Sequence, residues 1–370
     1  MLSVEEKMKQ RLAERQQAGL LRVLPPPLDG LTDFCSNDYL GLAHSLEQPS
    51  TQFAGATGSR LISGNTTAAE ELEMTIAQFH GAEAALLFPS GYTANIGLLP
   101  AISTRHDTII YDKLLHASLR DGIGLSQSKA YSFAHNDLTD LERKLQIAKG
   151  EKWVVVESVY SMDGDQAPLE AMAQLCESYD ANLIVDEAHG TGVLGQRGEG
   201  LVSALGLENK VWARVHTFGK AMGSHGAAVL GSKVLREYLI NFARSFIYTT
   251  ALPPATVAHL ATAYRVIQET PLVADLHQRI DYFLRACPAA IKERLILSST
   301  PVQAVLCPGN EAVKHLAQHL QAKKMAILPI RYPTVPQGEE RIRICLHAFN
   351  TNEEIDRLLA CLNNYFSPFA

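Results

Sequence analysis

This sequence of 370 residues has no excess of positive charge. Lys and Arg together number 33 and Asp and Glu number 39, which gives a net charge of −6 at pH 7. A protein that binds nucleic acid needs clustered Lys and Arg to meet the phosphates, and no basic stripe is present in the sequence. We therefore expect no nucleic-acid partner.

Long apolar runs are also missing. No stretch approaches the roughly 18 apolar residues that a membrane-spanning helix requires. Residues 1–7 carry no apolar core of a secretion signal. The sequence therefore predicts a soluble, cytoplasmic protein with no membrane partner.

Cysteine is sparse and scattered. The six cysteines show no CxxC spacing. The sequence therefore predicts neither a metal site nor a disulfide framework. We expect reduced thiols with mainly structural roles.

The chain does have enough apolar residues for a large core, because 46% of them are hydrophobic and only 19% are charged. Strand and helix patterns alternate up to about residue 218, which predicts an α/β fold with a largely parallel sheet and helices on both faces. After Pro253 and Pro254 the pattern changes to helices with a few short strands. We expect an N-terminal helix and arm (1–45), a large α/β domain (46–255) and a small α+β C-terminal domain (256–370).

Lys220 stands in an unusual setting for a lysine. It lies among small residues ahead of the apolar run 227–230, where a compact turn is expected rather than a solvated helix face. Partial burial lowers the pKa of an ammonium group, and a neutral amine can form a Schiff base with a carbonyl. An isolated Gly-Lys pair is more often part of a surface loop, so this interpretation depends on the segments around it.

Polar residues follow two apolar strands of the predicted sheet. One strand ends at Asp186, with His189 three residues later in a glycine-rich turn, and another ends at Glu157, shortly before Ser161. Ligands of open α/β sheets bind at the carboxyl ends of the strands. These side chains are therefore candidates for one shared site, although Asp186 taken alone is also a common helix N-cap residue.

A third strand, 84–88, leads into a candidate phosphate site. Ser90 and Gly91 follow it and open a helical pattern, and the first N–H groups of a helix suit a phosphate. A phosphate site, an aspartate and a reactive lysine are what pyridoxal 5'-phosphate requires of a protein. The sequence therefore indicates this cofactor.

Several motifs resemble those of the fold-type I pyridoxal-phosphate enzymes and, within them, the α-oxoamine synthase family. The resemblance runs from about Phe34 to the C-terminus. It implies a large domain with a mostly parallel, seven-stranded sheet and a homodimer with shared active sites. The motifs are Ser36-Asn-Asp-Tyr-Leu-Gly-Leu42, Gly58-Ser-Arg-Leu-Ile-Ser-Gly-Asn65, Asp186-Glu-Ala-His-Gly-Thr-Gly192, Thr217-Phe-Gly-Lys-Ala-Met-Gly-Ser-His-Gly-Ala-Ala228, Pro333-Thr-Val-Pro-Gln-Gly338 and Arg341-Ile-Arg343.

The resemblance also implies roles for individual residues around the cofactor. His116 would stack on the cofactor ring, Asp186 would hold the pyridine nitrogen protonated, and His189 would reach the phenolic oxygen. Glu157 and Ser161 would support the ring, His189 or the incoming acyl group. The phosphate would be bound by Ser90, Gly91, Tyr92 and Thr217, with Thr249 or Thr250 contributed by a second subunit.

Two further residues are expected to bind the amino-acid substrate. Asn37 is a turn former by its residue type alone, but the resemblance implies that it helps to hold the substrate carboxylate. Arg343 suits the same carboxylate because a guanidinium group can donate two parallel hydrogen bonds. Arg341 is a close competitor, because residues two apart on a strand share one face.

The resemblance implies a decarboxylative Claisen condensation between an amino acid and an acyl thioester of coenzyme A or an acyl carrier protein. The runs 223–228 and 333–336 favour L-alanine and a pimeloyl thioester, a step of biotin biosynthesis. Family members that use glycine or serine are the alternatives: 2-amino-3-ketobutyrate ligase, 5-aminolevulinate synthase and serine palmitoyltransferase. A non-catalytic protein of the same fold would be expected to lack the lysine or the aspartate. A dinucleotide-binding protein is disfavoured because no G-x-G-x-x-G follows the first strand.

Overall fold

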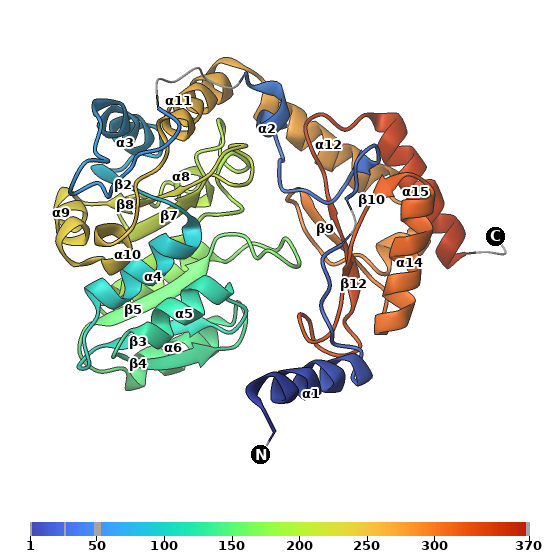
Figure 1. The fold of residues 1–370 in the computed structure, drawn as a ribbon, viewed down its shortest axis with the longest axis horizontal. Coiled ribbons are helices and arrows are strands. Elements are labelled where there is room, and N and C mark those ends of the chain that lie inside the picture. The colour runs from blue at the N-terminus through green and yellow to red at the C-terminus, as the bar shows by residue number, and fades with distance from the viewer. Residues whose placement is uncertain (1, 26, 48–52, 368–370) are drawn as a thin grey trace.

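A seven-stranded sheet forms the larger part of the molecule in the computed structural model, which describes residues 2–25, 27–47 and 53–367 (Figure 1). The fold class predicted from the sequence is confirmed. In spatial order the strands are β2 (Ala84–Phe88), β8 (Ala227–Gly231), β7 (Ala213–Thr217), β6 (Asn182–Asp186), β5 (Lys152–Glu157), β3 (Thr108–Asp112) and β4 (Lys129–Phe133).

Only one strand of this sheet runs against the others. β8 pairs antiparallel with β2 on one side and with β7 on the other, whereas the strands from β7 to β4 are parallel. Residues 227–231 form a strand that was not predicted from the sequence, where 227–230 stood out only as an apolar run. They follow the Lys220 turn directly, so β8 is the return arm of a hairpin with β7.

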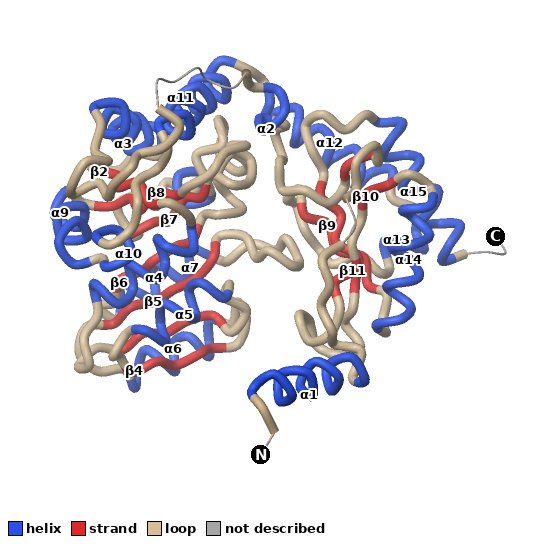
Figure 2. Tube along the Cα trace, viewed as in Figure 1, coloured by secondary structure: helices blue, strands red, loops and turns tan. Residues whose placement is uncertain are grey.

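Alternate residues of β2, β5, β6 and β8 face opposite layers of helices, which explains why these strands are largely apolar and buried. In β5, Trp153 and Val155 belong to one buried cluster, and Val154 and Val156 belong to the other. Figure 2 shows helices on both faces of the sheet. The first cluster contains residues of α4 (Gly91–Ile102), α5 (Ala117–Leu125), α9 (Lys233–Phe242) and α10 (Arg244–Ile247). The second contains residues of α3 (Thr67–Phe79), α6 (Leu138–Ile147), α7 (Leu169–Ser178), α8 (Leu201–Ala204) and α11 (Pro254–Glu269).

The C-terminal part is built on a small antiparallel sheet. Its strand order is β11 (Pro329–Ile330), β12 (Arg341–Cys345) and β9 (Val302–Leu306). Four helices supply apolar side chains that pack with these strands: α12 (Leu272–Ala286), α13 (Ala289–Lys292), α14 (Asn310–Ala322) and α15 (Asn352–Phe366).

The N-terminal arm packs against this C-terminal part. β1 (Thr32–Asp33) pairs in parallel with β10 (Met325–Ala326), and the carbonyl oxygen of Phe34 accepts from Cys345 N at 2.9 Å. The short helix α2 (Leu42–Ser45) follows. The expected N-terminal helix is present as α1 (Val4–Gln17), but none of its residues is buried, and its apolar side chains Met8 and Leu12 are exposed.

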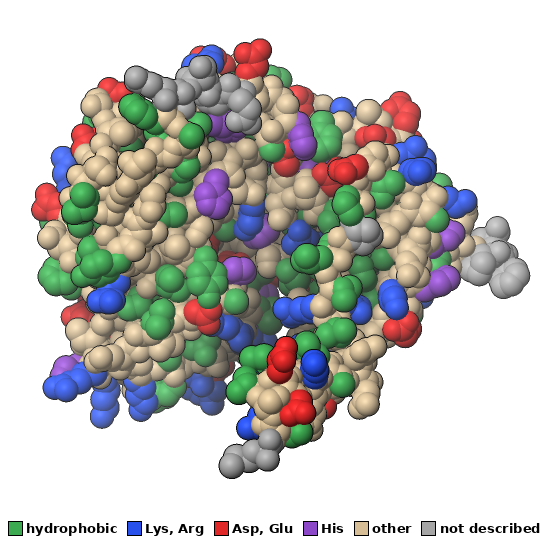
Figure 3. Space-filling view, viewed as in Figure 1, with side chains coloured by type: hydrophobic (Ala, Val, Ile, Leu, Met, Phe, Trp, Pro, Cys, Tyr) green, Lys and Arg blue, Asp and Glu red, His purple; other side chains and the backbone are tan. Residues whose placement is uncertain are grey.

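The surface is hollowed between the two parts, and His, Lys and Arg side chains gather around the hollow (Figure 3). The carboxyl ends of β5, β6 and β7 carry Glu157, Asp186 and Thr217. Across the described residues, no helix combines the length and the apolar character needed to cross a membrane.

Candidate active site

Most of the predicted site residues surround one cavity of about 250 Å³. Strands β5, β6 and β7 are neighbours, and Glu157 lies opposite Asp186 in the strand register, so their ends deliver side chains to the same place. The lining includes ten of the residues singled out from the sequence: Asn37, Ser90, Gly91, Tyr92, His116, Glu157, Asp186, His189, Thr217 and Lys220.

Asp186 is buried and held by two hydrogen bonds. Its Oδ2 accepts from Asn95 Nδ2 at 2.9 Å, and its Oδ1 accepts from Ala188 N at 2.9 Å. The Asn95 amide also donates to Ser118 Oγ at 3.0 Å, which fixes its orientation. A buried carboxylate kept in place by donors is suited to hold a positive ring N–H.

Lys220 lies in the turn between β7 and β8, within the electrostatic reach of two carboxylates. Burial lowers the pKa of Lys220, while the charges of Asp186 and Glu157 act in the opposite direction. Burial, together with the charge of Asp186, raises the pKa of Glu157. Lys220 is therefore more readily available as a neutral amine than a solvated lysine would be.

Two of the histidines that line the cavity, His116 and His189, are disposed to be neutral. Burial lowers the pKa of His116, and burial together with the charges of Lys220 and Arg343 holds the pKa of His189 well below its ordinary value. The backbone N–H of His116 donates to Glu157 Oε1 at 2.5 Å, and its Nδ1 lies 2.8 Å from Ser118 Oγ. A neutral imidazole can stack on a cationic ring without charge repulsion.

The N-terminus of α4 forms the predicted anion site. Ser90 is the N-cap residue, and its Oγ accepts from Thr93 N at 3.1 Å. The N–H groups of Gly91 and Tyr92 precede this capped turn and have no acceptor within the helix, so they remain available to a phosphate. A Cβ added at Gly91 would lie 2.5 Å from Cγ2 of Thr217, so only glycine lets the helix approach Thr217 this closely.

Arg343 lies behind the cavity wall and reaches it through Asn37. Its Nη2 donates to Asn37 Oδ1 at 2.8 Å, and its Nη1 donates to the carbonyl oxygen of Ser161 at 3.0 Å. Asn37 Oδ1 also accepts from the Tyr39 hydroxyl at 3.0 Å, and that hydroxyl lies 2.8 Å from His189 Nδ1. Ser161 thus meets Arg343 through its backbone, and it does not line the cavity.

Arg341 is engaged elsewhere. It forms an ion pair with Asp163, and its Nε donates to the carbonyl oxygen of Glu339 at 2.7 Å. The strand pattern could not show which of the two arginines faces the site, but their partners do. Arg343 faces the Lys220 site, and Arg341 faces the loop that contains Asp163.

Thr249 and Thr250 do not reach the Lys220 cavity within this chain. They line a second cavity of about 330 Å³, together with Arg60 and Ser63 of the motif at residues 58–65. Their contribution to a phosphate site from a second subunit remains a prediction.

Asn95 and Tyr39 are among the residues of the site that were not singled out from the sequence. Asn95 holds Asp186, and Tyr39 connects Asn37 to His189. A signal existed for Asn95, because it is the one polar side chain in the run 94–102 of the predicted helix. Tyr39 stands within the motif at residues 36–42, but its residue type alone predicts only an aromatic core position.

The residues present fit pyridoxal 5'-phosphate. The cavity combines an amine, a buried carboxylate and a helix N-terminus that approaches the Thr217 side chain closely because residue 91 is glycine. The Oδ1 atom of Asn95 is buried without a hydrogen-bond partner among the described residues, so the cavity wall also has a free acceptor. The amine suits the aldehyde of the cofactor, the carboxylate suits its ring nitrogen, and the helix N-terminus suits its phosphate.

Fold and cavity together define a fold-type I pyridoxal-phosphate enzyme, and comparison with known proteins agrees. The family model described as aminotransferase class I and II matches residues 29–362. The chain is 40% identical to the 8-amino-7-oxononanoate synthase of Marinobacter nauticus, over 95% of this chain and 94% of the relative. It is also 40% identical to that of Methylobacillus flagellatus, over 96% and 95%. The chain belongs to the aminotransferase class I and II family and, within it, to the 8-amino-7-oxononanoate synthases.

Solved structures share this fold, and some of them contain pyridoxal 5'-phosphate. A serine palmitoyltransferase from S. paucimobilis with a bound PLP–myriocin aldimine has a TM-score of 0.89 at 26% identity and covers 100% of both chains. The 8-amino-7-oxononanoate synthase of Francisella tularensis has a TM-score of 0.78 at 30% identity, over 91% of this chain and 98% of that one. The cofactor of this chain is pyridoxal 5'-phosphate.

Proposed function

We propose that this chain catalyses the decarboxylative condensation of L-alanine with a pimeloyl thioester, which gives 8-amino-7-oxononanoate, CO₂ and a free thiol. The observation that carries the proposal is that Lys220, Asp186 and the N-terminus of α4 surround one cavity. The choice of substrates is supported by relatives of nearly equal length that bear the name of this synthase.

Pyridoxal 5'-phosphate, when bound, supplies a sink for the negative charge that develops at the α carbon of the amino acid. We assign Asp186 to hold the ring nitrogen protonated, with Asn95 keeping its carboxylate in place. We assign the phosphate to the N–H groups of Gly91 and Tyr92 and to the Thr217 hydroxyl. Burial lowers the pKa of Lys220, so its Nζ is suited to accept the proton of the α carbon and later to return a proton to the product.

Arg343 and Asn37 are assigned to the amino-acid carboxylate. The Arg343 guanidinium is held by acceptors at Nη1 and Nη2, which fixes the plane of the group before substrate arrives. A carboxylate that replaces the Asn37 oxygen at Nη2 gains a charge-assisted hydrogen bond. The site therefore discriminates between amino acids and simple amines.

The acyl donor, the assembly and the location are further parts of the proposal. We propose coenzyme A or an acyl carrier protein as the thiol carrier and a homodimer in which the Thr249 and Thr250 segment of one subunit completes the phosphate site of its partner. The placement of both threonines away from the Lys220 cavity of their own chain supports this arrangement. We propose that the dimer is cytoplasmic, and we keep the division into parts 1–45, 46–255 and 256–370.

A serine-using reaction is the second candidate. Solved serine palmitoyltransferases superpose with TM-scores of 0.89 and 0.90, above the 0.78 of the Francisella synthase. Their identity to this chain is 26%, against about 40% for the relatives named 8-amino-7-oxononanoate synthase. Sequence identity over the whole chain is the better guide to substrate, because the overall fold is shared by enzymes of different specificity.

The test is a substrate matrix. The purified protein, loaded with cofactor, is incubated with L-alanine, glycine or L-serine, each against pimeloyl-CoA and palmitoyl-CoA, and thiol release is measured. The proposal expects the highest kcat/KM for L-alanine with pimeloyl-CoA. Faster release with L-serine and palmitoyl-CoA would favour the second candidate, and release with no amino acid would refute both.

A further inference from the structure

The loop at residues 159–166, called here the bridging loop, connects the two parts of the molecule at the site. It follows β5 and is closed by an isolated antiparallel bridge between Val159 and Gln166. In Figure 1 it extends from the end of β5 toward β9 and β12. Within the loop, Tyr160 N donates to the carbonyl oxygen of Asp165 at 3.0 Å. The loop is therefore a compact turn with its own hydrogen bonds.

One side of the bridging loop is bonded to the C-terminal part. The carbonyl oxygen of Gly164 accepts from Ser298 Oγ at 2.9 Å and from Thr300 Oγ1 at 3.0 Å. Gln166 Nε2 donates to Ser299 Oγ at 3.1 Å. Gly164 has a φ of +75°, and a Cβ added there would overlap with the carbonyl oxygen of Val302. The loop is thus pressed against the start of β9.

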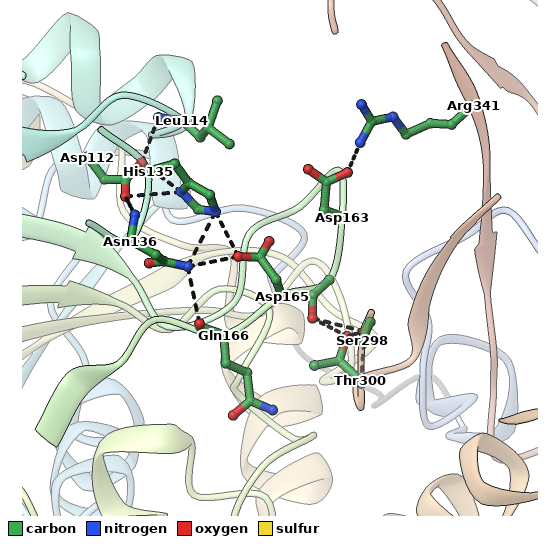
Figure 4. Close-up of polar contacts among 11 residues, drawn as sticks. Asp112, Leu114, His135, Asn136, Asp163, Asp165, Gln166, Ser298, Thr300 and Arg341 are labelled. Carbon is green, nitrogen blue, oxygen red and sulfur yellow. Dashed lines mark hydrogen bonds and ion pairs between the residues drawn. The ribbon is translucent and has the colours of Figure 1, made fainter. Parts of the chain in front are cut away.

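The same loop contacts both arginines of β12. Asp163 forms an ion pair with Arg341, and the carbonyl oxygen of Ser161 accepts from Arg343 Nη1 at 3.0 Å. Figure 4 shows Asp163 and Arg341 facing each other across the gap between their elements. The position of the loop therefore sets the position of the guanidinium assigned to the substrate carboxylate.

The other side of the bridging loop is tied to the large sheet by His135. Its Nε2 lies 2.7 Å from Asp165 Oδ2, and its Nδ1 lies 3.0 Å from Oδ1 of Asp112, which is fully buried at the end of β3 (Figure 4). The Tyr160 ring packs at right angles to the imidazole, with 4.4 Å between ring centroids. Asn136 Nδ2 supports the same Asp165 oxygen at 2.9 Å.

His135 is charged in this arrangement. Burial lowers the pKa of the imidazole, but its hydrogen bonds to Asp112 and Asp165 and the charges of both carboxylates outweigh burial and raise the pKa to about 9. An imidazolium that donates from both nitrogens to two carboxylates is a stiff connection. His135 does not line the Lys220 cavity. It therefore has no direct role in binding cofactor or substrate.

We propose that His135 is a positioning residue for Arg343: it ties the bridging loop to β3 through Asp112 and Asp165, and the loop in turn holds Arg343 in the plane that binds the amino-acid carboxylate. This inference rests on the proposed function only in requiring a substrate with an α-carboxylate. It does not depend on which amino acid or which acyl thioester is used.

The test compares a ligand that has the carboxylate with one that lacks it. Dissociation constants for L-alanine and for ethylamine are measured on the cofactor-loaded protein by isothermal titration calorimetry, for wild type, His135→Gln and Asp165→Asn. The expected result is an increase of about tenfold for L-alanine, on the order of 1.4 kcal/mol, with the value for ethylamine changed by less than twofold. The KM for the acyl thioester is also expected to stay within twofold.

His315→Gln is the matched control, because His315 is an exposed histidine of α14 whose Nδ1 lies 3.0 Å from the Tyr365 hydroxyl, away from the bridging loop. It should leave both dissociation constants unchanged. A parallel loss for L-alanine and ethylamine, or a lower melting temperature with unchanged affinity for L-alanine, would overturn the positioning role. If His135→Gln does not fold, the isosteric Asp165→Asn decides the question. If wild type binds glycine or L-serine rather than L-alanine, the proposed substrate is wrong, and the same comparison is made with that amino acid.

Discussion

Asn37 and Arg343 are 306 positions apart in the sequence, and the amide oxygen of one accepts a hydrogen bond from Nη2 of the other at 2.8 Å. The contact joins the N-terminal arm to β12 at the wall of the Lys220 cavity. It holds the Arg343 guanidinium beside the amide oxygen of Asn37. A substrate carboxylate can take the place of that oxygen as the hydrogen-bond acceptor. The predictions below begin from this pair.

Arg343→Lys should weaken binding of the amino acid more than it slows any later step of the reaction. Lysine keeps the charge but loses the planar fork that donates two hydrogen bonds, so we expect KM for L-alanine to rise about ten- to hundredfold, in line with a lost charge-assisted hydrogen bond of about 1.5–3 kcal/mol. Steady-state kinetics at saturating acyl thioester measure this. Arg265→Lys, at an exposed ion pair on α11, is the control, and an unchanged KM for Arg343→Lys would contradict the assignment.

Asp186→Asn tests the charge beside the ring nitrogen. Asparagine is nearly the same size, so the cavity should persist, but the negative charge that stabilises a protonated ring is lost. We expect kcat to fall on the order of 10²–10³-fold, as for the loss of one preorganised electrostatic group. Asp180→Asn, an exposed position with a φ of 50°, is the control because Asn tolerates that conformation. Equal kcat in both variants would refute the role of Asp186.

Gly91→Ala should disturb the phosphate site through a single methyl contact. The added Cβ would lie 2.5 Å from Thr217 Cγ2, so we expect the dissociation constant of the cofactor to rise about tenfold, on the order of 1.4 kcal/mol. Thr217→Ser removes that methyl group and keeps the hydroxyl. The double variant should therefore recover most of the affinity, measured by titration of the cofactor absorbance.

Gly124→Ala is the control for this pair, because no atom lies within 4 Å of a Cβ added there. Cofactor affinity should be unchanged in that variant. If Gly91→Ala binds the cofactor as tightly as wild type, or if the double variant binds no better than Gly91→Ala alone, the close approach of α4 to Thr217 has no part in cofactor binding.

Stability should depend on the protonation of His135. Its pKa is raised from 6.5 to about 9 in the folded protein, so its charged form is favoured by folding. The groups that face it are Asp112 from β3 and Asp165, Tyr160 and Asn136 around the bridging loop. The stabilisation is therefore complete below about pH 6.5 and is lost as the pH rises through about 9.

The measurement is the difference in melting temperature between wild type and His135→Gln at several pH values. We expect wild type to be more stable at pH 6 and the difference to shrink steadily toward pH 10. A difference that grows with rising pH would show that the imidazole is neutral in the fold.

The sheet could largely be predicted from local patterns, because several of its strands are apolar runs bounded by turns. The strand ends then placed Glu157 and Asp186 at one edge without any tertiary information, whereas the site role of Thr217 was implied only by the family resemblance. β8 was missed because its apolar run follows the Lys220 turn so closely that only its pairing with β2 and β7 distinguishes it as a separate strand. Local sequence carries no information about such pairing.

The long-range contacts of the site could not be predicted. Arg341 and Arg343 share one face of a strand by their spacing, and what separates them is Asp163 and Asn37, which lie far away in the chain. The same holds for His135, whose role depends on two carboxylates brought together by β3 and the bridging loop. Residue type and periodicity report what an element is, but not which distant side chain it meets.

The central claim is that the amine of Lys220 carries the cofactor. The most direct measurement is reduction of the cofactor-loaded protein with borohydride, followed by digestion and mass spectrometry, for wild type and Lys220→Ala. In wild type we expect a phosphopyridoxyl group on Lys220. In Lys220→Ala we expect loss of the visible absorbance and of turnover. A label on a different lysine, or a variant that keeps both the absorbance and full turnover, would contradict the central claim.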